Sequence, residues 1–582
     1  MVADTTISPI LKTQTPFAIE MHQSWKEVIP FALIFLAACW VLFFQLGKFP
    51  LFNPDEALYA EPAREMLLDG DWITTHLNYV VRYTKPPLCI WAMAGCFQIF
   101  GVTEFAARFF GAGCGAVLVA LTYWFSRRFV SLRAAVIASL TLCTAPLFVA
   151  VSRQAITDMP LALFTAGAIM CLYTAKETGS ARWRWLGYIL IGLAVMTKGP
   201  VGLILPVVPL AGFYLQRGEF KEAWHSLRPI SGLALVALIA LPWFIAEIAI
   251  TKGAYFTQFI IHENFQRYTS VVDKHEAPVW YHVVAMFGGF LPWSLFLPLS
   301  FFALVLALRA HGYRMKELDD SSKLSLMCWQ WALFILFFFS LSVSKLLPYT
   351  MPAFPALAIL AGQNIDRAIA GQKRIQILIP LILIGIAYGV TMQVGPGIVE
   401  KLKSDPVALK QALVGFAAFE SVLAAVCCLL AALNRLSVAV VGFAALTLVA
   451  MTHFGPRALL SLSEEWEAPI VAFSRYVAAS KDPIVVFSMR KPSVTFYAQR
   501  QVIITSHPVE LVQQLQSLPR AYVLGWENTW PDPSIVPGCR VVDHRGPFWL
   551  VQWINPDKPQ PAPPLRTDQS GSGLDPVVPA AN

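Results

Sequence analysis

Several features that mark nucleotide-dependent or disulfide-rich proteins are missing from this chain of 582 residues. It has no glycine-rich phosphate loop, no nucleophile elbow and no dinucleotide-binding fingerprint, so we expect it to use no nucleotide. Most of its ten cysteines lie inside apolar runs and indicate neither a disulfide framework nor a zinc pattern. Charge is also scarce, because Asp, Glu, Lys and Arg make up only 14% of the chain.

Apolar residues are abundant, at 56%, and they come in blocks of about 18 to 25, the length that spans a bilayer. The formal net charge of +8 would suggest nucleic acid in a soluble chain. Here, however, Lys and Arg lie between the apolar blocks, where they orient the spans and meet anionic headgroups. We therefore expect a polytopic membrane protein that contacts the bilayer and binds no nucleic acid.

Clusters of Lys and Arg between the blocks identify the cytoplasmic loops by the positive-inside rule. Alternation from these loops predicts about thirteen spans, with the N-terminus inside and the C-terminus outside. The predicted spans lie near 29–47, 106–126, 134–151, 160–175, 185–197, 201–215, 230–250, 280–308, 325–343, 346–362, 375–392, 411–432 and 436–453. The apolar run Leu88–Phe100 is too short to cross, so we interpret it as a helix at the outer surface.

The composition changes after the last span. Residues 1–455 form the predicted membrane region, with a first outer loop at about 48–105. Short β-rich runs such as "PIVVFSM" and "GPFWLVQWI" predict a small outer-side α/β domain at 456–556. Residues 557–582, rich in Pro, Ser, Asp and Gly, are expected to be disordered, and no internal repeat is visible.

The first outer loop opens with "FNPDEALYA". Asn53 suits a helix N-cap and Glu56 completes a capping-box pattern, which accounts for Glu56 without a catalytic role. Asp55 is explained less well, because it lies four residues before Tyr59 and shares its helix face. We therefore name Asp55 and Glu56 as candidate catalytic acids and Tyr59 as a candidate substrate contact.

The loop closes with "RYTKPPLCIW", in which Lys85 precedes two prolines and a new helix. A lysine beside unpaired helix N–H groups suits a phosphate, although a snorkelling interfacial lysine would look the same. In "MTKGPVG", Lys198 lies in a turn between two short apolar blocks, where a buried cation requires a watery cavity or an anion.

Three further outer segments carry ionisable residues. Asp158 in "SRQAITDMP" is a candidate acid or simply a helix-start residue, because Pro160 follows it closely. In "IIHENFQRYTS", Arg267 is a candidate phosphate contact, or the i,i+4 partner of Glu263. In "SVSKLLPYTMPAFPAL", Lys345 and Tyr349 lie in a proline-broken helix of the kind that lines cavities.

The predicted topology brings these loops to one face, with more cations than anions, so we expect an anionic ligand such as a lipid phosphate. A divalent cation is a candidate cofactor. Its weak candidate ligands are Asp55, Asp158, His262 and Glu263, but neither "HEN" nor "HEA" completes the two-histidine zinc motif.

Several of these segments resemble the bacterial aminoarabinose transferases of lipid A, which belong to the GT-C glycosyltransferase class with the protein O-mannosyltransferases. The resemblance rests on "FNPDEALYAEPAREMLLDGDWITTHLN", "YTKPPLCIWAMAGCFQIFGVTEFAARFFGA", "SRQAITDMPLALF", "MTKGPVG", "HENFQRY" and "SKLLPYTMPAFPALAIL". It implies a GT-C fold with Asp55 as the first-loop acid, Asp158 as the second-loop acid and Lys85 as a phosphate contact.

The resemblance also implies an activity: inverting transfer of 4-amino-4-deoxy-L-arabinose from undecaprenyl phosphate to a lipid A phosphate. This would take place at the periplasmic face of the bacterial inner membrane and would confer resistance to polymyxin and other cationic peptides.

Two alternatives remain open at this point. Another polyprenyl-phosphate-dependent transferase, such as a protein O-mannosyltransferase, would need Asp55 as a base because its acceptor is a hydroxyl. A phosphate acceptor needs no strong base, so Asp55 could instead orient it, hold the sugar's amine or stabilise the oxocarbenium. A transporter or lipid flippase is the more distant alternative. Transporters usually carry inverted repeats and acids near mid-bilayer, whereas the ionisable residues of this chain concentrate in the predicted outer loops.

Overall fold

The computed structural model describes residues 25–266, 277–400 and 407–557. Contacts divide the chain into two compact units. The first comprises residues up to Leu51 and then Leu58–Ser463, and the second comprises Phe52–Ala57 together with everything from Glu464. The short segment 52–57 thus packs with the C-terminal part of the chain, although its flanking residues belong to the first unit.

The first unit is helical, and the bounds of its N-terminal helices follow the apolar blocks of the sequence. These helices are α1 (Trp25–Phe43), α2 (Ala57–Asp69), α3 (Leu88–Phe100), α4 (Glu104–Phe129), α5 (Leu132–Cys143), α6 (Pro146–Ser152), α7 (Asp158–Thr178), α8 (Ala181–Lys198), α9 (Val201–Gln216), α10 (Phe220–Leu227) and α11 (Pro229–Ile250). The helix predicted at Leu88–Phe100 is confirmed as a separate 13-residue helix, α3, and its position at the outer surface stays a prediction.

The remaining helices of this unit include several short irregular ones. They are η1 (Phe256–Gln266), α13 (Tyr281–Gly289), η2 (Trp293–Phe296), α14 (Leu297–Ala310), η3 (Met315–Glu317), α15 (Asp320–Leu341), η4 (Leu347–Ala353), α16 (Phe354–Ala370), α17 (Arg374–Glu400), α18 (Val407–Ala432) and α19 (Leu436–Trp466). Helix α19 continues beyond residue 453, where the last span was expected to end.

Eight helices among the described residues are long and apolar enough to cross a membrane, or nine if the bent pair α5 and α6 counts as one span. The predicted class, a polytopic helical membrane protein, is confirmed. Other predicted spans correspond to shorter helices, such as α9 with 16 residues.

Two predicted continuous spans are broken in the structure. The span expected at 134–151 is the pair α5 and α6, bent by 64°. The span expected at 280–308 consists of α13, η2 and α14. Both breaks lie where a proline follows the first helix, Pro146 and Pro292 respectively, because proline lacks the N–H that would continue the hydrogen-bond ladder.

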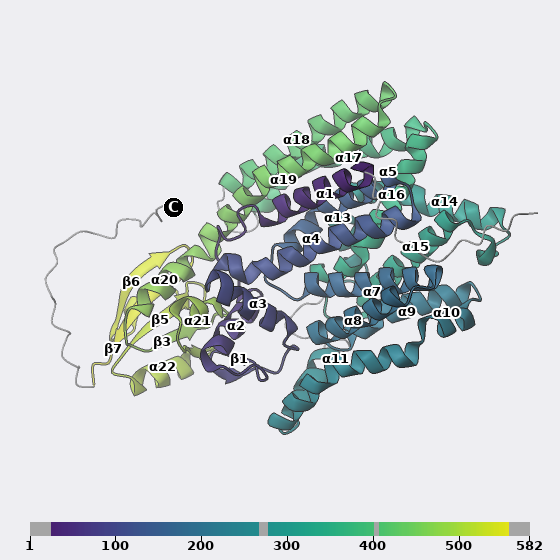
Figure 1. Cartoon of the computed structure of the whole chain (residues 1–582). Coiled ribbons are helices and arrows are strands. Elements are labelled where there is room, and N and C mark those ends of the chain that lie inside the picture. Colours follow the sequence, from purple (N-terminus) through teal and green to yellow (C-terminus); the bar gives the residue numbers. More distant parts are fainter. Residues whose placement is uncertain (1–24, 267–276, 401–406, 558–582) are drawn as a thin grey trace, which may run out of the picture. The chain divides into compact units, whose positions relative to one another are not determined.

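Helix α7 lies at the centre of the packing in the first unit. Its residues from Met159 to Ala175 are all buried, and it packs against α4, α8, α9 and η4. Figure 1 shows α7, α8 and α9 side by side. A helix buried on every side is hydrophobic all round, as this one is, so its first residue, Asp158, is held in a rigid surrounding.

The second unit confirms the predicted α/β domain. A five-stranded sheet has the order β4–β3–β5–β7–β6, in which β3 pairs in parallel with β4 and β5, and β7 pairs antiparallel with β5 and β6. Its elements are α20 (Ala468–Ala478), β3 (Ile484–Phe487), α21 (Ser493–Ala498), β4 (Ile503–Thr505), α22 (Pro508–Ser517), β5 (Arg520–Trp526), η5 (Pro533–Ile535), β6 (Cys539–Arg545) and β7 (Phe548–Ile554).

The central strands of this sheet are nearly continuous apolar runs, because layers of side chains cover both of their faces. All four residues of β3 are buried. The predicted tail at 557–582 lies, apart from its first residue, outside the described residues.

Candidate active site

An ion pair joins the ends of two neighbouring helices in the first unit. Lys198, the last residue of α8, donates from Nζ to the Oδ1 atom of Asp158, the first residue of α7, at 2.7 Å. Both side chains are about 14% exposed or less. An acid at a helix N-terminus and a base at a C-terminus each complement the helix dipole, so the pair is stabilised from both sides.

The turn after Lys198 fixes this arrangement. Gly199 has a φ of +74°, a left-handed conformation that side chains rarely adopt, and Pro200 then leads into α9. The same ammonium group lies 4.6 Å from the centre of the Tyr349 ring. Lys198 therefore meets one carboxylate and one aromatic face, and of the two expected surroundings, a watery cavity or an anion, Asp158 supplies the anion.

Tyr59 of α2 joins this pair to a second cation. The Arg82 guanidinium carbon lies 5.0 Å from the centre of the Tyr59 ring. Burial raises the pKa of the Tyr59 hydroxyl, while the nearby Arg82 and Lys198 cations oppose this shift and the Asp158 carboxylate adds to it. Tyr59 thus lies within electrostatic reach of both the Lys198–Asp158 pair and Arg82.

A third cation completes the arrangement. Lys85 donates from Nζ to the Oε2 atom of Glu263, in the π-helix η1, at 3.1 Å. Burial lowers the pKa of Arg82, whereas the charges of Tyr59 and Glu263 raise it, so Arg82 also senses this carboxylate. The expected helix start directly after the two prolines is confirmed, because α3 begins at Leu88.

A cavity of about 320 Å³ opens beside these residues. Its lining includes Arg82, Thr84, Gln258, His262 and Glu263. Among the side chains that the structure describes, the Nη1 atom of Arg82 and the Oγ1 atom of Thr84 are buried without a hydrogen-bond partner. Buried donors normally have partners, and both of these residues line the same cavity, so we consider it a candidate site for an acceptor-rich ligand.

We call these residues the cationic cluster: Tyr59, Arg82, Lys85, Asp158, Lys198 and Glu263. It holds three cations and two carboxylates, a formal excess of one positive charge. In a partly buried site such an excess attracts an anion more strongly than it would in water.

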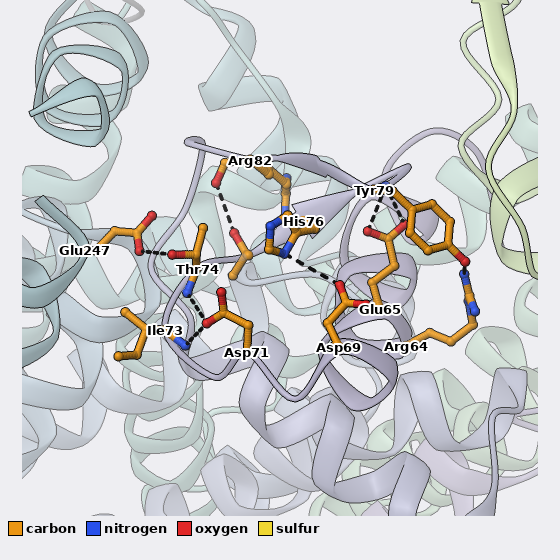
Figure 2. Close-up of polar contacts among 11 residues, drawn as sticks. Arg64, Glu65, Asp69, Asp71, Ile73, Thr74, His76, Tyr79, Arg82 and Glu247 are labelled. Carbon is orange, nitrogen blue, oxygen red and sulfur yellow. Dashed lines mark hydrogen bonds and ion pairs between the residues drawn. The ribbon is translucent and has the colours of Figure 1, made fainter. Parts of the chain in front are cut away.

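The loop that supplies Arg82 and Lys85 is tied down by polar contacts (Figure 2). Strands β1 (His76–Leu77) and β2 (Val80–Val81) pair as a hairpin whose turn residues, Asn78 and Tyr79, both have positive φ. The Tyr79 N–H donates to Glu65 at 3.1 Å, and Arg64 donates to the Tyr79 hydroxyl at 3.4 Å. Arg64 and Glu65, which are consecutive in α2, thus hold the side chain and the backbone of Tyr79.

The other end of the same loop is anchored to α11. Asp71 accepts from the N–H groups of Ile73 and Thr74, and the Thr74 hydroxyl donates to Glu247 at 2.9 Å. Beyond the hairpin, Arg82 pairs through its backbone with Thr75. These contacts give the loop a fixed course from α2 to the cavity.

Other predicted site residues have different surroundings. Lys345 is buried, and its ammonium group donates to the backbone carbonyls of Ser340, at 3.1 Å, and Ser342. This places a cation at the C-terminus of α15, where it complements the dipole and has a structural role. Tyr349 lies in η4, the predicted proline-broken segment, and packs on Phe339 as well as under Lys198.

The two first-loop acids lie in segment 52–57 and belong to the second unit. Glu56 is 1% exposed and accepts from the Phe52 N–H at 2.8 Å, whereas Asp55 is exposed. The expected helix start is wrong, because residues 53–56 form a turn and α2 begins at Ala57. Asn53 has tertiary partners instead, which override its local capping preference.

Arg267 and the possible ion pair between Arg267 and Glu263 lie outside the described residues. Among the described residues, Glu263 pairs with Lys85, 178 positions earlier in the chain. Arg82 and Thr84 were not predicted as site residues. They could have been identified from their position in "RYTKPP", directly before Lys85, because this segment was already selected for its lysine.

For a metal, the described residues contain no group of three or more His, Cys, Asp or Glu side chains arranged to hold an ion. His262 and Glu263 are adjacent and both line the cavity, which gives two ligand types but not a set. Within the described ranges, these two residues therefore do not form a complete set of metal ligands.

Comparison with known proteins finds a family model and several similar proteins. Residues 27–252 match the family model described as dolichyl-phosphate-mannose-protein mannosyltransferase. A protein of Aeromonas hydrophila named undecaprenyl phosphate-alpha-4-amino-4-deoxy-L-arabinose arabinosyl transferase is 32% identical over 335 residues, which are 56% of this chain and 59% of that protein. A protein of the same name from Edwardsiella ictaluri is 35% identical over 54% of this chain and 56% of its own length. The alignments thus span less than two thirds of these relatives.

Solved structures extend the similarity to nearly the whole chain. The crystal structure of ArnT from Cupriavidus metallidurans bound to undecaprenyl phosphate has a TM-score of 0.74 at 25% identity, covering 90% of this chain and 97% of that one. The same protein in the apo state has a TM-score of 0.76 and covers 91% and 98%. The membrane unit and the small sheet domain are therefore both part of a known architecture.

Proposed function

We propose that this chain is a member of the ArnT family of GT-C membrane glycosyltransferases and that it transfers 4-amino-4-deoxy-L-arabinose from undecaprenyl phosphate to a phosphate group of lipid A. The proposed location is the periplasmic face of the inner membrane, which is supported by the basic loops expected on the opposite side. One observation carries the proposal: Arg82 and Thr84 line a cavity beside the cationic cluster, and each has a buried donor without a hydrogen-bond partner among the described residues.

The donor phosphate fits these unmet donors. A phosphate ester offers several strong acceptor oxygens, and charge-assisted hydrogen bonds to it are stronger than neutral ones. Arg82 Nη1 and Thr84 Oγ1 would each gain a partner, and Lys85 would exchange Glu263 for the phosphate. The bound anion thereby removes the cost of burying those groups unpaired.

In the transfer, the bond between the sugar's anomeric carbon and the donor phosphate oxygen breaks through an oxocarbenium-like state. The departing undecaprenyl phosphate keeps the electron pair, and an oxygen of the acceptor phosphate forms the new bond. The leaving phosphate gains negative charge as this happens, so Arg82, Lys85 and Lys198 lower the barrier by stabilising it.

An acceptor phosphate needs little activation. Its second pKa is near ~6, so it is already an anion at neutral pH. Asp158 then serves to hold Lys198 in place and charged, through their 2.7 Å contact. Asp55 stays a proposed acid of the reaction on sequence and family grounds, as a group that orients the acceptor, holds the sugar's amine or stabilises the oxocarbenium.

The test uses the full chain in lipid nanodiscs with an undecaprenyl-phosphate-linked aminoarabinose donor and lipid A. Mass spectrometry should find lipid A heavier by one aminopentose, and a nucleotide sugar offered alone should give no product. Product from the nucleotide sugar, or no product from the lipid donor with wild-type protein, would overturn the proposal.

A second candidate, transfer of mannose to protein, is favoured by the description of the family model that matches residues 27–252. It differs in the acceptor, since a serine or threonine hydroxyl needs a general base. Expression of the chain followed by mass analysis of lipid A and of membrane proteins distinguishes the two: the first proposal requires the mass increase on lipid A.

A further inference from the structure

A buried polar network within the second unit holds the segment that carries Asp55. The side-chain amide of Asn53 donates to Glu467 Oε2 at 2.5 Å and to Ser493 Oγ at 2.6 Å. The Asn53 N–H donates to Glu467 Oε1 at 3.2 Å, and the Ser493 N–H donates back to Asn53 Oδ1 at 3.1 Å. Lys491 donates to Glu467 Oε1 at 3.3 Å. We call Asn53, Glu467, Lys491 and Ser493 the clamp.

The burial and the hydrogen bonds of the clamp residues favour a single conformation. Glu467 and Ser493 are only 4% and 1% exposed. Glu467 accepts through both oxygens, and Asn53 uses its amide nitrogen, its amide oxygen and its backbone N–H. Networks of this kind specify one conformation, because any other would leave buried charges without partners.

The clamp lies next to the candidate catalytic acid Asp55 in the chain. Asn53 lies two residues before Asp55, and Glu56, on the other side, is 1% exposed with its carboxylate on the Phe52 N–H. The turn is thus fixed on both sides of one exposed acid. Glu467 lies in the turn between α19 and α20, and Lys491 lies in the loop before α21; neither segment is part of the predicted membrane site.

We propose that Glu467 is a positioning residue for Asp55, and that the C-terminal α/β unit takes part in sugar transfer by holding the first-loop turn in its working conformation through the clamp. This inference rests on the proposed function. Its physical basis is that displacing a reacting group by about 1 Å can cost about 100-fold in rate, even when the change lies away from the chemistry.

A reciprocal swap tests this. Asn53→Asp places a carboxylate against that of Glu467, so we expect kcat to fall at least tenfold, equivalent to ~1.4 kcal/mol, with the KM for the lipid donor changed less than about threefold. The double variant Asn53→Asp/Glu467→Gln exchanges the acid and the amide between the two positions. It should recover most of the lost kcat, whereas a general loss of structure would not be rescued.

A second readout does not depend on catalysis. Hydrogen exchange of residues 52–57 should become faster in Glu467→Gln, while exchange in β3 and β5 of the same unit stays at the wild-type rate. Glu464→Gln is the matched control, since Glu464 is exposed and lies one helical turn away on α19. If wild-type protein transfers no sugar but Glu467→Gln still loosens the turn, the proposed function fails and the clamp stands.

Two outcomes would overturn the inference. One is unchanged exchange at 52–57 in Glu467→Gln, and the other is kcat within twofold of wild type in Asn53→Asp. Should Asn53→Asp not fold, Ser493→Ala removes one hydrogen bond of the same network and is read by the same two measurements.

Discussion

The cationic cluster and the clamp both bury charged side chains, but they differ in how completely their hydrogen bonds are satisfied. Among the described residues, Arg82 and Thr84 beside the cluster each have a buried atom without a partner, whereas no side-chain nitrogen or oxygen of the clamp is in that condition. Buried polar groups are costly when unpaired, and a bound ligand is one way to complete the set. Other described side chains, such as Trp549 in the second unit, also have an unpaired buried atom, so it is the cavity lined by Arg82 and Thr84 that makes this region a candidate binding site.

The variant with the largest expected effect is Arg82→Met. If Arg82 binds the donor phosphate, the transfer rate of the variant should be lower than that of wild type by at least about 100-fold, as when one hydrogen-bond donor to a developing anion is removed. Its melting temperature should stay the same or rise, because a buried group without a full set of partners is replaced by an apolar one. Transfer is measured by mass spectrometry of lipid A and melting by intrinsic fluorescence in detergent.

Arg314→Met is the control, since Arg314 forms an exposed pair with Glu317 at 3.2 Å and should affect neither measurement. Transfer within threefold of wild type in Arg82→Met would remove Arg82 from the site. A large fall in melting temperature would show that its role is structural, which would erase the contrast with the clamp.

The Lys198–Asp158 pair is the part of the cationic cluster that most resembles the clamp, because each group has its partner. Lys198→Met should lower transfer about tenfold and also destabilise the protein, since it leaves a mostly buried carboxylate unpaired. Asp158→Asn/Lys198→Met should be more stable than the sum of the single changes predicts, with a coupling of about 0.5–3 kcal/mol. Additive single effects in thermal unfolding would show that the two groups do not interact.

Local patterns predicted much of the fold. Blocks of apolar residues predicted the helices and α3 even to its bounds, because burial in a membrane region leaves a signal in every few residues. The glycine-containing turn between α8 and α9 was likewise predicted, although Lys198 itself is the last residue of α8 and precedes the turn. The β-rich runs predicted β3, β4, β5 and β7, while β6, with its polar "CRVVDHR", was missed.

Long-range partners could not be predicted in the same way. Lys85 and Glu263 are 178 residues apart, and Asn53 and Glu467 are 414 apart. The pattern around Asn53 predicted a helix cap, and that local preference gave way to three stronger tertiary contacts. Pairing of this kind depends on how helices and domains pack, which no short stretch of one sequence encodes.

Within the clamp, a graded change sharpens the comparison. Ser493→Ala removes the hydroxyl that accepts from the Asn53 amide but keeps the Ser493 N–H contact. We expect a loss of about 1 kcal/mol in the free energy of unfolding, the usual value of one buried hydrogen bond. Ser517→Ala, on the exposed end of α22, is the control. Equal melting of wild type and Ser493→Ala would mean that the network is not tightly coupled.

The smallest expected effect concerns pH and the polar contacts of the first loop. Burial and the neighbouring Glu61 carboxylate raise the pKa of Glu65 to about 8, with the Tyr79 N–H opposing the shift. Because this pKa in the folded protein is above the unfolded value of ~4.3, the contribution of Glu65 to stability is complete below pH ~4.3 and is lost as the pH rises toward the folded pKa.

Hydrogen exchange at residues 76–81 should therefore speed up between pH 6 and pH 9 beyond the intrinsic pH effect. Glu65→Gln, which mimics the protonated acid, should remove that excess. Glu317→Gln, an exposed acid, should retain it. An identical pH profile in wild type and Glu65→Gln would show that Glu65 is ionised throughout, and that the loop, like the clamp, is held by a full set of charged partners.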